Sequence, residues 1–187
     1  MMNLQPTPLE GCFIIEPKVF GDERGYFFES FNQEKFQKLT GDDTVFVQDN
    51  QSYSTKGVLR GLHFQTGQSA QAKLVRVVKG EVLDVAVDLR AGSKTYGKHF
   101  GLKISGKNNL QLFIPRGFAH GFVVLSDDAI FQYKCDNYYD KAAEGGIHYA
   151  DPDLNIDWIL PHDGLIVSDK DNELPYLANA LQFKFLK

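Results

Sequence analysis

Short runs of alternating apolar and polar residues fill most of the chain and predict β-strands. Turns rich in glycine, asparagine and aspartate separate these runs. Many short strands at regular spacing are typical of a β-sandwich or barrel, and not of βαβ units. The predicted strands cover residues 12–15, 26–31, 44–53, 58–65, 73–78, 81–89, 100–104, 110–114, 119–125 and 130–135.

Two segments carry helical signals. Asn32 can cap a short helix over residues 33–39, which Gly41 would end. Residues 174–181 can form a short closing helix. No repeat, linker or low-complexity segment interrupts the chain, so we expect residues 1–187 to form one mainly β domain with a few peripheral helices.

Residues 73–78 and 81–89 are predicted to pair as a β-hairpin, because a two-residue turn with glycine joins them. In that register Lys73 becomes a diagonal neighbour of Asp84 on an otherwise apolar face. The pattern leaves open whether this is a structural ion pair, an edge pair that reaches water, or part of a site.

An arginine, a histidine and two glycines lie inside the strand-like residues 57–65. Glycine weakens a strand, so its presence suggests a bulge or a close backbone approach beside a site. Strict alternation places Arg60 and His63 on opposite faces of the strand. A titratable histidine among small and apolar neighbours is either a satisfied core residue or a functional group with a partner.

Composition limits the function classes. Hydrophobic residues make up 43% and charged residues 24% of the 187 residues, as in ordinary globular proteins. The net charge of -4 argues against a nucleic-acid surface, although a local basic pocket for a phosphate remains open. The chain shows no signal peptide and no run of ~20 apolar residues, so we expect no membrane partner. We expect Cys12 and Cys135 to be free thiols in a reducing cytoplasm.

Residues 115–120 read Pro-x-Gly-x-x-His, which matches the second signature of the cupin barrel and ends at His120. The first cupin signature opens Gly-x5-His-x-His and continues to a glutamate. Gly57 and His63 fit its opening. The two signatures therefore indicate a cupin-type jelly roll in which the two histidines belong to the site.

The rest of the first signature departs from the pattern of metal-binding cupins. Gln65 stands at the place of the second histidine, and Ser69 and Ala70 stand where the glutamate would be. A first-row metal needs three or four ligands, and only His63 and His120 remain. We therefore expect no metal, and two histidines suited to proton transfer or polar binding.

Over essentially its whole length the chain resembles the dTDP-4-dehydrorhamnose 3,5-epimerase family. The matching segments, which agree in order and spacing, are residues 21–25, 28–29, 48–50, 57–65, 73–75, 115–122, 133–134, 138–139, 144–145 and 168–171. The resemblance implies a jelly-roll homodimer whose N-terminal strands cross to the partner. It also implies the conversion of dTDP-4-dehydro-6-deoxy-D-glucose to dTDP-4-dehydro-L-rhamnose for polysaccharide synthesis, without metal or cofactor.

The resemblance also assigns catalytic roles. A 4-keto group acidifies the hydrogens on C3 and C5, so inversion needs a base, an acid on the other face and positive charge at the oxygen. His63 would be the base, oriented by Asp171, and Tyr133 the acid. Lys73 would stabilise the enolate, with Asp84 holding it. Taken alone, the sequence favours Tyr133 as a core tyrosine.

Further positions are expected to bind the substrate. His120 would lie at the sugar and Tyr139 would stack on thymine. Without the resemblance, Arg24 and Glu29 read as ordinary surface charges. The substrate-binding residues implied by the resemblance are Arg24, Phe28, Glu29, Gln48, Asn50, Arg60, Asp84, His120, Tyr139, Glu144 and Lys170.

Other functions stay open at this level. Single-centre epimerases share the pattern of His63, Lys73 and Asp171, whereas the related 3,4-ketoisomerases keep His-x-His where this chain has Gln65. A sugar-binding cupin without catalysis would need no histidine–aspartate pair. A metal-dependent cupin oxygenase would need ligands that the signature lacks.

Overall fold

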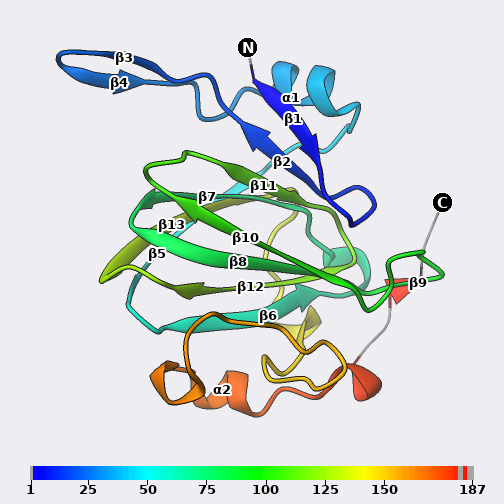
Figure 1. Ribbon diagram of the computed structural model, residues 1–187. Helices are drawn as coiled ribbons and strands as arrows, with labels where there is room; N and C mark the ends of the chain where they lie inside the picture. The colour runs from blue at the N-terminus through cyan, green and yellow to red at the C-terminus, as the bar shows by residue number, and fades with distance from the viewer. Residues whose placement is uncertain (1, 181–182, 185–187) are drawn as a thin grey trace.

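Two antiparallel β-sheets packed face to face form the centre of the protein (Figure 1). The computed structural model describes residues 2–180 and 183–184. The six-stranded sheet has the order β1 (Asn3–Pro6), β2 (Phe13–Glu16), β11 (Gln111–Ile114), β7 (Lys73–Lys79), β13 (Asp128–Cys135) and β5 (Gln48–Thr55). The five-stranded sheet has the order β10 (His99–Ser105), β8 (Glu81–Asp88), β12 (Phe118–Val124), β6 (Leu59–Gln65) and β14 (Glu144–Gly146). The mainly β sandwich predicted from the sequence is confirmed.

Short elements surround the sandwich. They are the hairpin of β3 (Phe20–Asp22) and β4 (Gly25–Phe27), the parallel pair β9 (Arg90–Ala91) and β15 (Phe183–Lys184), the helices α1 (Gln33–Thr40) and α2 (Asp169–Asn172), and 3-10 turns at Gly67–Ser69, Lys141–Ala143, His162–Gly164 and Leu177–Asn179. Within the described residues, no helix is long and apolar enough to cross a membrane.

Helix α1 forms as predicted, because its caps are encoded locally. The side chain of Asn32 accepts a hydrogen bond from the Lys35 backbone N–H at 3.1 Å, and Gly41 ends the helix with φ of 68°. Phe36 is buried against the outer face of the six-stranded sheet. The closing helix expected over residues 174–181 is wrong over its described part, where only a 3-10 turn at Leu177–Asn179 forms; residue 181 lies outside the described residues.

The predicted hairpin between residues 73–78 and 81–89 is wrong. Strand β7 pairs with β11 and β13, whereas β8 pairs with β10 and β12 in the facing sheet. Gly80, with φ of 81°, lies in the turn that carries the chain from one sheet to the other. Strand β8 is buried along nearly its whole length, and β7 is buried at Leu74, Val75 and Val77, so their hydrophobic pattern does not identify a pairing partner. Val75 and Val82 nevertheless belong to the same hydrophobic core cluster between the sheets.

The β3–β4 hairpin extends away from the sandwich as an arm (Figure 1). Its apolar side chains lie largely in solvent: Phe20 is 54%, Tyr26 60% and Phe27 68% exposed. The two cysteines, in contrast, are buried and free, as expected. Burial raises the pKa of Cys12 to about 12 and that of Cys135 to about 11.

Candidate active site

A cavity of about 640 Å³ opens between the two sheets. Its walls come from β5, β6, β7, β12, β13 and the segment 166–171. A second cavity of about 320 Å³ adjoins it and shares Asn50, His63, Lys73 and Tyr133. The four shared residues therefore mark the centre of the site.

A β-bulge in β6 brings Arg60 and His63 onto the same face. Opposite β12, His63 pairs with His120 and Arg60 pairs with Phe122, so β6 has one extra residue between the two pairs. Gly61 lies in this bulge, where an added Cβ would come within 2.5 Å of the Gly121 Cα. Strict alternation, which separated Arg60 from His63, is therefore wrong here: both line the larger cavity.

His63 and Asp171 form a close pair although they are far apart in the sequence. His63 Nε2 lies 2.7 Å from Asp171 Oδ1, and the Gly61 backbone N–H donates to Asp171 Oδ2 at 3.2 Å. Burial raises the pKa of Asp171, but these bonds outweigh it and hold the pKa below its ordinary value. Ser168 caps α2 and so places Asp171 beside the ring. A charged carboxylate thus orients the imidazole.

A second histidine–aspartate pair lies on the neighbouring strand, because His120 on β12 pairs with His63 on β6. His120 Nε2 lies 2.7 Å from Asp84 Oδ1, and both side chains are buried. Burial lowers the pKa of His120, while Asp84 opposes this shift. The other oxygen of Asp84, Oδ2, has no hydrogen-bond partner among the described residues. Asp84 therefore contacts the site through His120, and its expected ion pair with Lys73 is not formed.

Lys73 and Tyr133 face the histidines from the six-stranded sheet. The Lys73 ammonium lies 5.8 Å from the Tyr133 ring centre. Burial lowers the pKa of Lys73, while the Asp84 and Glu144 carboxylates oppose this shift. Burial also raises the pKa of Tyr133, so its phenol keeps its proton near neutral pH. The imidazole of His63 and the protonated phenol of Tyr133 thus line opposite walls of one cavity.

Tyr139, Glu144 and Lys170 are connected by polar contacts at the mouth of the site. Glu144 accepts a hydrogen bond from the Tyr139 hydroxyl at 3.1 Å and pairs with Lys170 at 2.6 Å. Gln48 accepts from the Tyr139 backbone N–H at 3.2 Å and donates to Asn50 at 3.1 Å. The expected nucleotide-binding residues on these segments therefore lie together beside the catalytic centre.

The other three expected substrate-binding residues belong to the arm and its continuation. Arg24 pairs with Asp22 and has a side chain 85% exposed, and Glu29 pairs with Lys35 at 2.8 Å. Phe28 lies against Arg76, whose guanidinium is 5.4 Å from the ring centre. None of the three lines either of the two central cavities.

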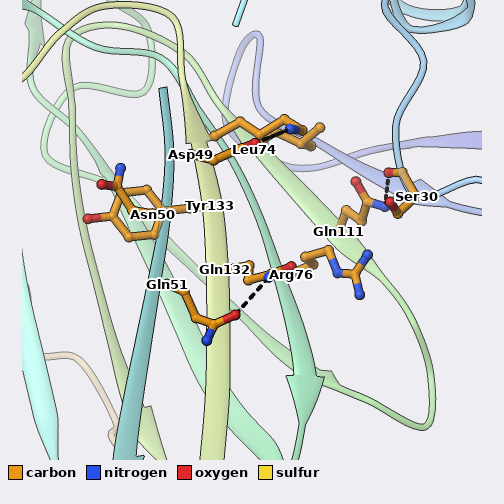
Figure 2. Close-up of a pocket in the computed structure, with 10 residues that line it drawn as sticks. Ser30, Asp49, Asn50, Gln51, Leu74, Arg76, Gln111, Gln132 and Tyr133 are labelled. Atoms are coloured by element: carbon orange, nitrogen blue, oxygen red, sulfur yellow. Dashed lines mark hydrogen bonds and ion pairs between the residues drawn. The ribbon is translucent and has the colours of Figure 1, made fainter. Parts of the chain in front are cut away.

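Figure 2 shows why Arg76 and the site belong to different faces of the six-stranded sheet. Asn50 and Tyr133 point to one side of the strands, and Arg76 and Gln111 point to the other. Gln111 donates to the Ser30 carbonyl at 2.7 Å, so the chain that follows the arm crosses the outer face. Phe28 is therefore separated from His63 by the sheet of its own chain.

Sequence reasoning missed the residues that hold the site in place. Ser168 belonged to a matching segment but was given no role, and Gln71 was not singled out. In the structure Ser168 caps α2, and Gln71 donates to the Asn137 carbonyl at 2.8 Å. The Ser-x-x-Asp spacing of residues 168–171 is a capping signal and could have identified the first. No local signal marks Gln71. Within residues 2–180 and 183–184, no three His, Cys, Asp or Glu side chains are grouped to hold a metal ion; the absence of a metal stays a prediction.

Comparison with known proteins gives consistent results. Residues 6–179 match the family model described as dTDP-4-dehydrorhamnose 3,5-epimerase. A curated protein of that name from Shigella flexneri is 56% identical over 91% of this chain and 93% of its own. One from Escherichia coli is 51% identical over 99% of this chain and 100% of its own.

A solved structure agrees with the whole fold. The dTDP-6-deoxy-D-glucose-3,5-epimerase from Legionella pneumophila, in complex with dTDP-4-keto-L-rhamnose, is 48% identical. The match covers 100% of both chains with a TM-score of 0.96. The cupin-type fold and the epimerase class expected from the sequence are therefore confirmed. The chain belongs to the dTDP-4-dehydrorhamnose 3,5-epimerase family.

Proposed function

We propose that the protein inverts C3 and C5 of dTDP-4-dehydro-6-deoxy-D-glucose through an enolate, giving dTDP-4-dehydro-L-rhamnose without metal or cofactor. One observation carries the proposal: the His63–Asp171 pair and the protonated Tyr133 face each other across one cavity, with Lys73 between the sheets beside them. Two faces of a sugar ring held there would meet a base and an acid.

His63 acts as the base through Nδ1. Its Nε2 donates to Asp171, so Nδ1 is left to accept a proton. Nδ1 takes the hydrogen from C3 or C5, and the electron pair of the broken C–H bond forms a C=C bond to C4. The C4 carbonyl becomes an enolate oxygen, and Asp171 stabilises the imidazolium that results.

Lys73 and Tyr133 complete each inversion. The Lys73 ammonium stabilises the negative enolate oxygen. As the enolate collapses to the ketone, Tyr133 gives its hydroxyl proton to the same carbon from the opposite face. The phenolate then regains a proton and His63 loses its own, both by exchange with solvent. His120, fixed by Asp84, contributes a polar contact to the sugar.

The nucleotide half of the substrate would lie along the mouth. The ring of Tyr139 is 53% exposed and is free to stack on thymine. The guanidinium of Arg60 lines the larger cavity, where its planar fork suits a phosphate. Arginine and lysine side chains here would offset the charge of the diphosphate.

We further propose that the protein works as a homodimer in which the arm reaches the site of the partner. Arg24, Phe28 and Glu29 lie outside the cavities of their own chain, and the arm exposes Phe20 and Phe27. A second copy would cover these apolar side chains. The free thiols of the buried cysteines support a reducing cytoplasmic location.

Isotope incorporation tests the proposed reaction. The keto-sugar nucleotide is incubated with the protein in deuterated water, and the labelled, inverted carbons are counted by NMR. Deuterium at both C3 and C5 is expected. Label at one carbon would identify a single-centre epimerase, and no label would contradict epimerisation.

A further inference from the structure

The two positions at which the chain departs from the cupin metal signature both bind the same residue. Gln65 Oε1 accepts a hydrogen bond from the Asp140 backbone N–H at 2.8 Å. The Ser69 hydroxyl donates to the Asp140 carboxylate at 3.2 Å. Asp140 directly follows Tyr139 in the chain. Positions that hold a metal in other cupins are thus tied here to the segment that carries Tyr139.

Glutamine side chains hold the backbone of residues 137–140, the segment that carries Tyr139. Besides Gln65, Gln71 donates to the Asn137 carbonyl at 2.8 Å, and Gln48 accepts from the Tyr139 N–H at 3.2 Å. The side chain of Tyr139 is half exposed and has little packing to hold it. The position of its ring therefore depends on these backbone hydrogen bonds and on the hydrogen bond from its hydroxyl to Glu144.

Gln65 has a second polar group that these contacts leave unused. Its residue is 6% exposed and lines the smaller cavity together with Tyr139 and Glu144. The Asp140 N–H occupies Oε1, which fixes the orientation of the amide. Nε2 makes no hydrogen bond to the described residues. Nε2 is accessible from this cavity, so an acceptor atom of a bound ligand can pair with it.

We propose that Gln65 is a nucleotide-recognition residue: Nε2 donates to an acceptor oxygen of the bound nucleoside diphosphate, while Oε1 holds the Tyr139 segment. Gln65 follows His63 by two residues on the same face of β6, so one strand serves both proton transfer and nucleotide binding. The acceptor is a pyrimidine carbonyl or a phosphate oxygen. This inference rests on the proposed nucleotide site at Tyr139 and Glu144.

Gln65→Glu separates the two roles of the amide. Glutamate keeps an acceptor for the Asp140 N–H and replaces the donor with an oxygen that repels another acceptor. We expect the Kd for dTDP, measured by calorimetry, to rise about 10-fold or more. Gln132→Glu is the matched control, because Gln132 lies on the outer face of the six-stranded sheet (Figure 2) and should change the Kd less than about twofold.

A second control variant tests whether loosening the segment of residues 137–140 alone weakens dTDP binding. Gln71→Met removes another hydrogen bond to the same segment, from an Nε2 that already donates to the Asn137 carbonyl. We expect it to bind dTDP within about threefold of the unchanged protein. An equal weakening in Gln65→Glu and Gln71→Met would overturn direct recognition by Gln65, and so would a Gln65→Glu variant that binds dTDP normally.

Two smaller ligands show whether the acceptor of the Gln65 Nε2 hydrogen bond belongs to the pyrimidine or to the phosphates. Thymidine and inorganic pyrophosphate are titrated into the unchanged protein and Gln65→Glu. Weakening for thymidine assigns the contact to the pyrimidine, and weakening for pyrophosphate assigns it to the phosphates. Either result supports the proposal. Weakening for neither probe overturns it.

Turnover provides an independent readout. With the keto-sugar nucleotide, Gln65→Glu should raise KM about 10-fold and leave kcat within about threefold. A fall in kcat with unchanged KM would overturn the inference. Calorimetry with dTDP requires no turnover, so the inference stands if dTDP binding depends on Gln65 while the isotope test finds no epimerisation. It fails, with the epimerase proposal intact, if turnover occurs and Gln65→Glu has no effect on KM or Kd.

Discussion

The candidate site residues in the sandwich contact one another within one chain, whereas those of the N-terminal arm lie apart from the site of their own chain. His63, Asp171, Lys73 and Tyr133 converge on a shared cavity, supported by short hydrogen bonds and burial. The arm, in contrast, carries Arg24 into solvent and pairs it only with its own Asp22. The comparison teaches that the chemical groups are assembled by folding of one chain, whereas in the proposed dimer the arm would complete the binding surface of a second chain.

Removal of the base should have the largest effect. His63→Ala is expected to lower kcat by about 10³- to 10⁴-fold, because it deletes the group that accepts the proton in the transition state. The Kd for dTDP should change little. Steady-state kinetics and calorimetry measure the two values. His99→Ala, at an exposed position on β10, is the control and should retain full activity; retained epimerisation in His63→Ala would contradict the assigned role.

Removal of the acid should have a somewhat smaller effect. Tyr133→Phe is expected to lower inversion by about 10²-fold, because proton removal continues while reprotonation from the other face is lost. Mass spectrometry in deuterated water should detect exchange at C3 or C5 without inversion. Tyr53→Phe removes an exposed hydroxyl on β5 and is the control. Equal loss of exchange and inversion would assign Tyr133 another role.

The arm can be tested by mixing variants. Arg24→Ala alone should raise KM about 10-fold, through loss of a charge-assisted contact to phosphate. When Arg24→Ala and His63→Ala chains are co-expressed, a mixed dimer regains one site with an intact His63 and an intact arm. The kcat/KM of the isolated mixed dimer should then exceed the sum expected from its two variants. Strict additivity would mean that the arm does not cross.

Acid should weaken the His63–Asp171 pair, which is the smallest expected effect. The folded pKa of Asp171 lies below its ordinary value of 3.8, so its charge-dependent stabilisation is present above that value and is lost as the pH falls through the folded pKa. The melting temperature of the unchanged protein should exceed that of Asp171→Asn at pH 6, and the gap should shrink below pH 3.8. A constant gap between pH 6 and 3 would contradict the charged pair.

Local sequence signals predicted helix α1 and most of the individual strands. The caps at Asn32 and Gly41 fixed α1, and most strands occur within a few residues of their predicted bounds. Strand pairing was not local. Strands β7 and β8 both carry runs of buried apolar residues, which do not specify a pairing partner, so the short turn at Gly80 favoured a hairpin that the sandwich does not contain.

The sequence predicted which residues line the candidate site better than it predicted their strand register and hydrogen-bond partners. Spacing and family resemblance identified His63, Tyr133 and Lys73, which the structure brings together. The bulge at Gly61 was suspected from its glycine but its effect on register was not, since one extra residue is visible only against the partner strand. The partner of Asp84 was also mistaken for Lys73, because that inference depended on the hairpin.

The contact between Gly61 and Gly121 limits how this enzyme can be re-engineered. A methyl group at either position would meet backbone atoms of the other strand, at 2.5 Å from Gly121 Cα or 2.7 Å from the Arg60 carbonyl. Backbone cannot rotate away as a side chain can, so neither site should tolerate even alanine. Mutant libraries aimed at new sugars should keep both glycines constant and vary cavity-wall positions such as Ser52 and Ile166, which line the larger cavity.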